Sequence, residues 1–335
     1  MEIRLFFIVF AYGLLFIGRL FYIYKGMCAE MLTRPNKILA FLSLFPQSFR
    51  ELKRNDPLRM AGATAFFTTF ALPPILIILF QLFSLFLSRK LVGSQMRDIL
   101  SSTLGTAGAE QIRMTTRGFR SLVTNWYIAI VLFVFLIFVA TTLFLVIKNT
   151  LNDIWHVKVK DKPGFLFGLK NRARSFGAIL LAGILFLASI VIDSFEVFAG
   201  KYITRIWPDG GHYFTGVINE LLGAVVVSIW FTILFRYLAN AHPSWKVSLV
   251  GGVITGIFFS IGKNVLAFLM RHSNLDNLYG TSASIVLILL FVFYSSFILY
   301  FGACFIKVYA EAIQHPWRTA RKAYRYQFSE MKEGG

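Results

Sequence analysis

The residues of this sequence that could do chemistry are charged and amide side chains inside, or at the ends of, long apolar runs. They are Asp193, Glu196, Asn219, Glu220, Lys263, Asn264 and Arg271. Ionisable groups within a membrane-spanning segment are costly, and they usually serve binding, proton transfer or ion pairing. Carboxylates and cations at a similar depth would bind a charged substrate or couple its movement to protons. These seven residues form the candidate substrate or coupling site, and Lys263 is its strongest single member.

A structural interpretation of the same residues stays open. Asp193, Glu196 and Glu220 lie near the ends of their apolar runs, where a carboxylate can reach water. Lys263 lies deeper, but a lysine can extend its ammonium group toward the interface while its stem stays in apolar surroundings. Under this interpretation the charges only hold the helices together.

Enzymatic chemistry has no comparable support in the sequence. The five histidines are isolated, and the two cysteines, Cys28 and Cys304, lie far apart. No H-x-H or H-E-x-x-H pattern and no metal-spaced cysteine pair is present. We therefore expect no catalytic residues, no metal site and no cofactor, and we expect that the protein is not an enzyme.

The elements that must position the candidate residues are membrane-spanning helices. Hydrophobic residues make up 57% of the 335-residue chain and charged residues 15%, against about a quarter in soluble domains. The apolar runs lack strict alternation, and backbone groups in lipid must be satisfied within the segment, so helices are favoured over barrel strands. The predicted fold class is all-α, a polytopic membrane protein.

Six apolar runs approach or exceed the roughly 20 residues that a helix needs to cross a hydrocarbon core of about 30 Å. The predicted spans are 61–88, 125–148, 175–198, 217–239, 247–270 and 281–308. A further stretch, 5–24, is interrupted by Arg19 and is a span, an anchor or an artefact of the gene start. We therefore divide the chain into an N-terminal hydrophobic extension (1–30), one transmembrane domain (31–310) and a basic cytoplasmic tail (311–335).

The distribution of lysine and arginine predicts the orientation of the spans. Basic residues concentrate in alternate connections, as they do when those connections are cytoplasmic. The basic segments are 24–60, 149–174 and the tail after 308. The connection 89–124, expected to be an outer loop, is an exception with six basic residues. We expect a bacterial inner-membrane protein with both termini in the cytoplasm, and anionic lipid headgroups rather than nucleic acid as partners of its net charge of +18.

Two kinds of segment are predicted to lie at the membrane surface. Segment 36–54 has apolar residues near helical spacing and basic residues at its end, which is typical of an interfacial helix. In the stretch LNDIW, Asn152 and Asp153 are expected to cap a cytoplasmic helix, and Trp155 is expected to lie at headgroup level. A partner or regulatory site on the cytoplasmic face is the alternative for this stretch.

Pro73 and Pro74 lie in the middle of the first span. In a membrane helix, nearby hydroxyls can satisfy the backbone groups that proline leaves free, and Thr68 and Thr69 lie one turn earlier. The pair predicts a kink or a local unwinding. Either it is a bend that improves packing, or it is a hinge that lines a binding site.

Gly252 and Gly256 lie four residues apart in the fifth span. This G-x-x-x-G spacing allows two helix backbones to approach closely. We predict a close helix contact at these two glycines. A sliding surface for a conformational change is the alternative.

Four stretches resemble, in their order and spacing, the YihY/BrkB family of bacterial inner-membrane proteins, formerly labelled ribonuclease BN. They are NDPLRMAGATAFFTTFALPPILII (55–78), LNDIW (151–155), RYLANAHPSWKVSLVGGVITGIFFSIGKNV (236–265) and YGTSASIVLILLFVFYSSFILYFGACF (279–305). The chain departs from the family pattern at Phe66, Phe67 and Ala71 and in its doubled proline. The resemblance implies six helices, cytoplasmic termini and an inner-membrane location, with links to virulence and to envelope lipids or exported solutes. Ribonuclease activity would need acid/base or metal groups that this sequence does not offer.

Three classes of function remain open. The first is a transporter or flippase for an envelope lipid or another amphiphilic or charged solute, which is the favoured interpretation. The second is a transporter or channel for a small ion, using the same polar residues. The third is an envelope scaffold that transports nothing.

Overall fold

The computed structural model describes most of the chain. The described residues are 35–83, 88–121, 126–159, 208–272, 283–314, 318–319 and 323–326, with six single positions between 173 and 184. The N-terminal stretch 5–24 and nearly all of the predicted third span, 175–198, lie outside these residues. Predictions that concern those two segments stay predictions.

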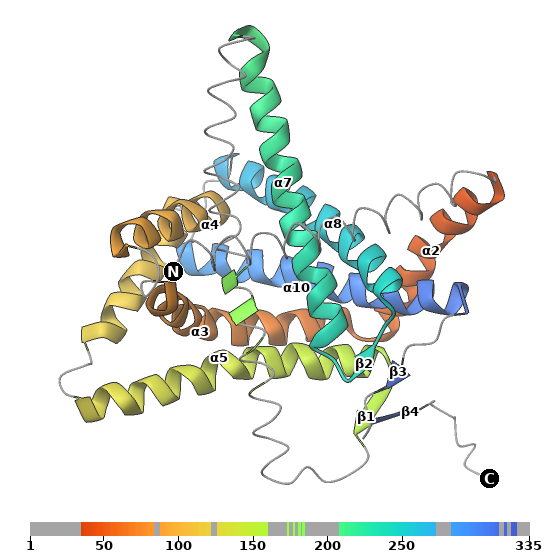
Figure 1. Cartoon of the computed structure of the whole chain (residues 1–335), viewed down its shortest axis with the longest axis horizontal. Helices are drawn as coiled ribbons and strands as arrows, with labels where there is room; N and C mark the ends of the chain where they lie inside the picture. Colours follow the sequence, from red (N-terminus) through yellow and green to blue (C-terminus); the bar gives the residue numbers. More distant parts are fainter. Residues whose placement is uncertain are drawn as a thin grey trace, which may run out of the picture.

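Most of the described residues are helical (Figure 1). The helices are α2 (Pro35–Arg54), α3 (Pro57–Phe83), α4 (Arg89–Ser121), α5 (Trp126–Ile154), α7 (Pro208–Tyr237), α8 (Trp245–His272) and α10 (Ala283–Ala312). The helical stretches long and apolar enough to span a membrane are Pro57–Gln81, Ile130–Ile154, Glu220–Tyr237, Trp245–Leu266 and Ile285–Ala312. The prediction of an all-α polytopic membrane protein is confirmed, and these five stretches coincide with five of the six predicted spans.

Helix starts follow local rules. Pro35, Pro57 and Pro208 are each the first residue of a helix, a position at which proline loses no hydrogen bond and its fixed φ fits. At the start of α8 the hydroxyl of Ser244 accepts a hydrogen bond from the Val247 amide at 3.4 Å. Such a cap satisfies one of the amide groups that the first helical turn leaves unpaired.

Helix α10 is the central element and packs against α2, α3, α4, α5 and α8 (Figure 1). The Tyr294 hydroxyl donates to the Phe258 carbonyl of α8 at 2.9 Å, and Tyr300 is hydrogen-bonded through its hydroxyl to Thr64 of α3. Late residues of α10 thus meet early residues of α3, so the two helices run antiparallel. The same relation holds between α10 and α8, where Gly251 lies against Ile306.

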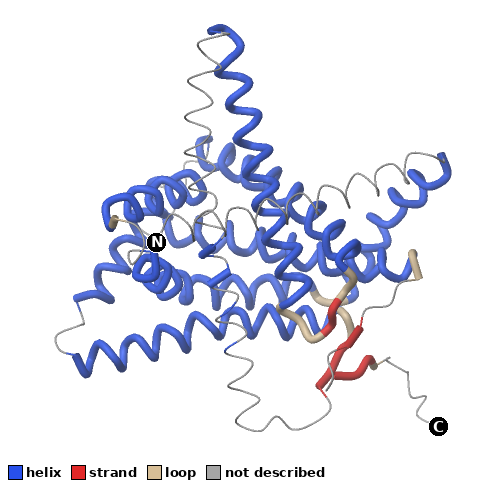
Figure 2. The backbone as a smooth tube through the Cα atoms, viewed as in Figure 1, coloured by secondary structure: helices blue, strands red, loops and turns tan. Residues whose placement is uncertain are grey.

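Four short strands join three helix ends at one end of the bundle, which we call the clasped end (Figure 2). Strand β1 (Val157–Val159), after α5, pairs antiparallel with β4 (Ala323–Arg325). Strand β2 (Ala241–His242), after α7, pairs with β3 (Arg318–Thr319). The described part of the C-terminal segment is therefore hydrogen-bonded to two connections of the bundle.

The connection 89–124, expected to be a loop, is largely the 33-residue helix α4. Membrane spans are predicted from long apolar runs. Because α4 is mostly polar, it contains no such run and was not predicted. The helix packs against α3 and α10. Helix α2, in contrast, coincides with the amphipathic helix predicted over 36–54.

The expectations for LNDIW were wrong. Asn152 and Asp153 belong to the last turn of α5 and cap no following helix; the Asn152 side-chain oxygen accepts a hydrogen bond from the Asn240 amide at 2.9 Å. Trp155 does not lie at a lipid headgroup but is fully buried, and its indole donates to the Ala303 carbonyl at 2.9 Å. The sequence could not reveal that the ends of α7 and α10 cover these residues.

Helix α3 continues without interruption through Pro73 and Pro74, so the local unwinding that we considered does not occur. The hydroxyls of Thr68 and Thr69 donate to the carbonyls of Thr64 and Ala65, at 2.7 and 2.9 Å. The prolines would free the carbonyls one turn later, so the two threonines do not serve them. A threonine hydroxyl in a helix reaches back toward the preceding turn, which explains the error.

Candidate functional site

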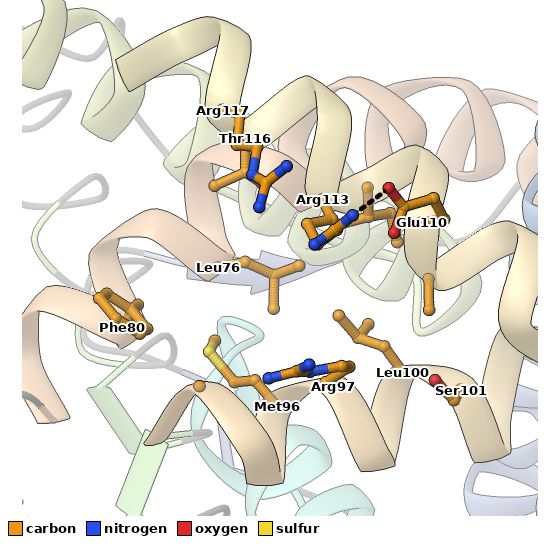
Figure 3. A pocket seen from close by; sticks show the side chains of 13 residues that line it. Leu76, Phe80, Met96, Arg97, Leu100, Ser101, Glu110, Arg113, Thr116 and Arg117 are labelled. Atoms are coloured by element: carbon orange, nitrogen blue, oxygen red, sulfur yellow. Dashed lines mark hydrogen bonds and ion pairs between the residues drawn. The ribbon is translucent and has the colours of Figure 1, made fainter. Parts of the chain in front are cut away.

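A cavity of about 610 Å³ lies between α3 and α4 (Figure 3). Its lining side chains come from the second half of α3 and from both halves of α4. They are Leu76, Phe80, Met96, Arg97, Leu100, Ser101, Ala109, Glu110, Ile112, Arg113, Thr116 and Arg117, together with Gly93. We call it the arginine cavity. It combines apolar walls with three guanidinium groups.

The arginines reach the cavity from two directions (Figure 3). Arg113 and Arg117 lie one helical turn apart, so both share a face of the second half of α4. Arg97 lies on the first half, on the ribbon segment that faces them in Figure 3. The apolar side chains Leu76 and Phe80 come from α3, whose membrane-spanning stretch includes them.

One of the three arginines is paired with a carboxylate in the cavity wall. The Arg113 guanidinium donates to the Glu110 carboxylate at 2.5 Å. This hydrogen bond lowers the pKa of Glu110, and the positive charges of Arg117 and Arg97 act in the same direction. Within the described part of the chain, Arg97 and Arg117 have no carboxylate within 4.0 Å. The cavity therefore carries an excess of positive charge.

Three of the residues predicted to form the polar site meet between α7 and α8. The Lys263 ammonium lies 3.6 Å from the Glu220 carboxylate, and the Asn264 amide donates to the same carboxylate at 3.0 Å. The side chains of Lys263 and Glu220 are 36% and 46% exposed in the isolated chain. Antiparallel packing of α7 and α8 places them away from the clasped end.

The other predicted site residues are not brought into this group by anything the structure describes. Asn219 belongs to α7 and Arg271 to α8, but only their backbone is described. Asp193 and Glu196 lie outside the described residues. A cluster of all seven residues therefore stays a prediction.

Gly252 and Gly256 lie at the contact between α7 and α8. A Cβ added at Gly252 would lie 2.0 Å from the Thr232 hydroxyl and 2.7 Å from the Thr232 amide nitrogen. A Cβ at Gly256 would lie 2.2 Å from the Ser228 hydroxyl and 3.0 Å from its Cα. The two backbones approach so closely that a side chain has no room at either position.

The clasped end holds a buried ion pair that was not predicted from the sequence. The Lys307 ammonium of α10 lies 2.5 Å from the Glu51 carboxylate of α2, with the side chains only 8% and 16% exposed. Burial by itself raises the pKa of Glu51, but the hydrogen bond and charge of Lys307 outweigh it, so the pKa lies below its usual value. Burial and the charge of Lys307 lower the pKa of nearby His156.

No group of three or more histidine, cysteine, aspartate or glutamate side chains suited to a metal ion occurs among the described residues. The described polar groups support two kinds of chemistry. The arginine cavity can hold an anion beside apolar material, and the group around Lys263 can exchange ion pairs.

Arg97, Arg113 and Arg117 were not predicted as site residues, although the excess of basic residues in their segment was noted. Segment 89–124 holds six lysines and arginines, although the predicted orientation makes it an outer connection, where the charge rule expects few. Arg113 and Arg117, at a spacing of four, and Glu110, three residues before Arg113, were the further signal. A helical interpretation of the segment would have placed these three residues on one face.

Comparison with known proteins assigns the chain to a family. The model described as virulence factor BrkB matches residues 48–327. The chain belongs to the BrkB family. This range includes α2 from Ser48 onward, the arginine cavity and both strand pairs.

The BrkB-family relatives are known as membrane proteins. A UPF0761 membrane protein of Teredinibacter turnerae is 28% identical over 284 residues, covering 84% of this chain and 63% of the relative. One of Saccharophagus degradans is 24% identical, covering 82% and 61%. One of Haemophilus influenzae is 26% identical, covering 78% and 91%.

The match thus spans about three fifths of the length of the first two of these BrkB-family relatives. No solved structure matches the chain. The chain is accordingly a multi-pass membrane protein of this family.

Proposed function

We propose that this protein is a bacterial inner-membrane transporter or flippase for an amphiphilic anion, such as an envelope lipid, and not an enzyme. The observation that carries the proposal is the arginine cavity, which places guanidinium groups beside apolar walls. An amphiphilic anion presents the complementary pair of surfaces, a charged headgroup and an apolar chain. Part of the wall belongs to the spanning helix α3, which offers the chain a route to the hydrocarbon core.

The orientation that we propose has both termini in the cytoplasm, with the clasped end on that side. Helix α2 would then lie in the cytoplasmic interface among anionic headgroups. Its side chains Leu39, Leu42 and Phe49 are 68%, 54% and 56% exposed, which favours contact with lipid. The opposite face of α2 packs on the bundle, where Leu44 and Leu52 are buried. The arginine cavity would lie on the outer side.

Translocation in proteoliposomes tests the proposal. The purified chain is reconstituted with a trace of a fluorescent anionic phospholipid, and a membrane-impermeant quencher reports how fast the lipid crosses the bilayer. Exchange faster than in protein-free vesicles is expected, and exchange slowed by replacing Arg97 and Arg117 with glutamine. Rates equal to those of protein-free vesicles for every anionic lipid offered would contradict the proposal.

A small-ion transporter is the second candidate, because Lys263, Glu220 and Asn264 form an exchangeable ion-pair group between two spanning helices. Ion flux into the same proteoliposomes, measured with and without lipid translocation, separates the two functions. Flux that needs Lys263 but not the arginines would favour the ion transporter. Absence of both activities would favour a scaffold.

A further inference from the structure

We infer that the arginine cavity selects a lipid whose headgroup is a phosphate monoester. The inference rests on the proposed function and deepens it by naming the substrate class. A lipid phosphate monoester and a soluble phosphate ester share the same phosphate dianion. The attached hydrocarbon chain distinguishes the lipid from the soluble ester.

Charge favours the monoester over the commoner diester headgroups. Arg97, Arg113 and Arg117 contribute three positive charges, and Glu110 contributes one negative charge, so these four side chains carry a net charge of +2. A phosphate monoester carries about −1.5 to −2 charges at pH 7, because its second pKa is about 6. A phosphodiester carries a single charge and would leave one guanidinium without a counter-charge.

The positions of the arginines suit a tetrahedral group with several free oxygens. A guanidinium donates two parallel hydrogen bonds to phosphate, and a monoester offers three terminal oxygens where a diester offers two. Arg113 and Arg117 approach from one half of α4 and Arg97 from the other, so the oxygens of one phosphate can be bound from both sides.

The Glu110–Arg113 ion pair positions one guanidinium group at the cavity before a ligand binds. The Glu110 carboxylate, 2.5 Å away, is the partner of Arg113 at the cavity wall when no ligand is bound, and both side chains are 45% exposed, so a ligand can reach them. A phosphate can take over the hydrogen bond that Glu110 accepts without moving the helix. The exposed pair contributes little to stability, which leaves Arg113 free to exchange partners.

The apolar walls indicate that the phosphate carries a hydrocarbon chain. Leu76, Phe80 and Met96 line the same cavity as the guanidinium groups, so a hydrocarbon chain attached to the phosphate would meet an apolar surface there. A volume of about 610 Å³ accommodates a headgroup with the first part of a chain, not a complete lipid. The remainder of the chain would follow α3 into the bilayer.

Binding to the full-length protein in mild detergent tests the inference without requiring transport. The probes share their acyl chains: dioleoyl phosphatidic acid, a monoester; dioleoyl phosphatidylglycerol, a diester; and inorganic phosphate, which has no chain. The variants are Arg97→Gln and Arg117→Gln. Arg59→Gln is the matched control, because it removes the same charge at an exposed pair with Asp56 outside the cavity.

The expected result is that phosphatidic acid binds roughly tenfold more tightly than phosphatidylglycerol, and that each cavity variant weakens it roughly tenfold. Arg59→Gln leaves the affinity unchanged, and inorganic phosphate at equal concentration does not compete. Equal affinity for the two lipids, or an affinity insensitive to both cavity variants, overturns the inference. Competition by inorganic phosphate at equal concentration overturns the lipid assignment in favour of a soluble phosphate ester.

The two failures can be told apart. If the selectivity for a monoester is absent but fluorescent anionic lipids still cross the bilayer, the proposed function stands and the inference falls. If phosphatidic acid binds through the arginines but no lipid crosses, the site is real and the transport proposal falls.

Discussion

Glu51 and Lys307 at the clasped end are 16% and 8% exposed, whereas Glu110 and Arg113 in the arginine cavity are each 45% exposed, although both pairs are 2.5 Å apart. The first pair joins helices that are distant in sequence and is enclosed by packed side chains. The second joins residues one turn apart on one helix and borders a cavity. Two ion pairs of equal length thus differ in surroundings: the buried pair suits holding two helices together, and the exposed pair suits the ligand exchange that we propose for the cavity.

The largest expected effect is at the clasped end. Lys307→Ala removes the nearer partner of the poorly solvated Glu51 carboxylate and leaves it only the exposed Arg54 guanidinium at 3.8 Å, which we expect to lower the free energy of unfolding by about 3 kcal/mol. The midpoint of thermal unfolding in detergent measures it. The double variant Glu51→Gln, Lys307→Met removes both charges and should recover most of the loss. A single variant as stable as wild type would mean that the pair does not fasten α2 to α10.

The next effect concerns the contact between α7 and α8. Gly252→Ala places a methyl group 2.0 Å from the Thr232 hydroxyl and 2.7 Å from backbone, so the helices must separate, at a cost of about 2 kcal/mol. Gly223→Ala on α7 is the control, because nothing lies within 4 Å of the added group. The same unfolding assay compares them, and equal stability of the two variants would show that the close contact is absent.

Acidification should loosen the clasped end and leave the cavity end less affected. Since the pKa of His156 lies below its ordinary value of 6.5, the unfolded chain binds more protons as pH falls through 6.5, and stability decreases from there. The lowered pKa of Glu51 adds stability that is present above its ordinary value of 4.5 and lost as pH falls below it.

Amide hydrogen exchange at the β1–β4 pair, followed as pH is lowered, reports this loosening. His156→Asn removes the first step, and it also keeps the positive φ of 51° that asparagine tolerates. Protection that stays constant from pH 7.5 to 5 in wild type would contradict the assignment to His156.

The smallest expected effect on stability is at Lys263. Its pair with Glu220 is well exposed in the isolated chain, so Lys263→Ala should change the unfolding free energy by less than about 1 kcal/mol. We expect this variant to abolish translocation of the fluorescent anionic lipid in proteoliposomes while the protein stays folded. Glu220→Gln, which keeps the size of the partner, is the companion variant. Unchanged transport in Lys263→Ala would remove Lys263 from the functional site.

The same contrast explains what the sequence could predict. Helices α3, α5, α7, α8 and α10 were predicted because lipid demands long apolar runs, and such runs are visible without knowing the fold. Helix α4 was mistaken for a loop because it is polar and is positioned by packing against α3 and α10. The depth of Lys263 and Glu220 could be estimated from the rise per residue, and the structure places them in contact.

Contacts between distant segments could not be predicted. Trp155 has the composition of a headgroup anchor but is covered by the end of α10, and Lys307 gains its partner from a helix more than 250 residues earlier. Arg97 and Arg113 meet at one cavity only because both halves of α4 line it. The charged residues are visible in the sequence, but which of them lie close together depends on the fold.

The measurement that tests this account most directly is native mass spectrometry of the protein purified in mild detergent. Wild type is compared with the variant Arg97→Gln, Arg117→Gln and with Lys307→Ala. The account predicts that wild type and Lys307→Ala retain a phosphate-bearing lipid, that the double arginine variant loses it, and that only Lys307→Ala unfolds at a lower temperature. The same lipid retained by all three proteins, or by none, would contradict the division between a fastening end and a binding end.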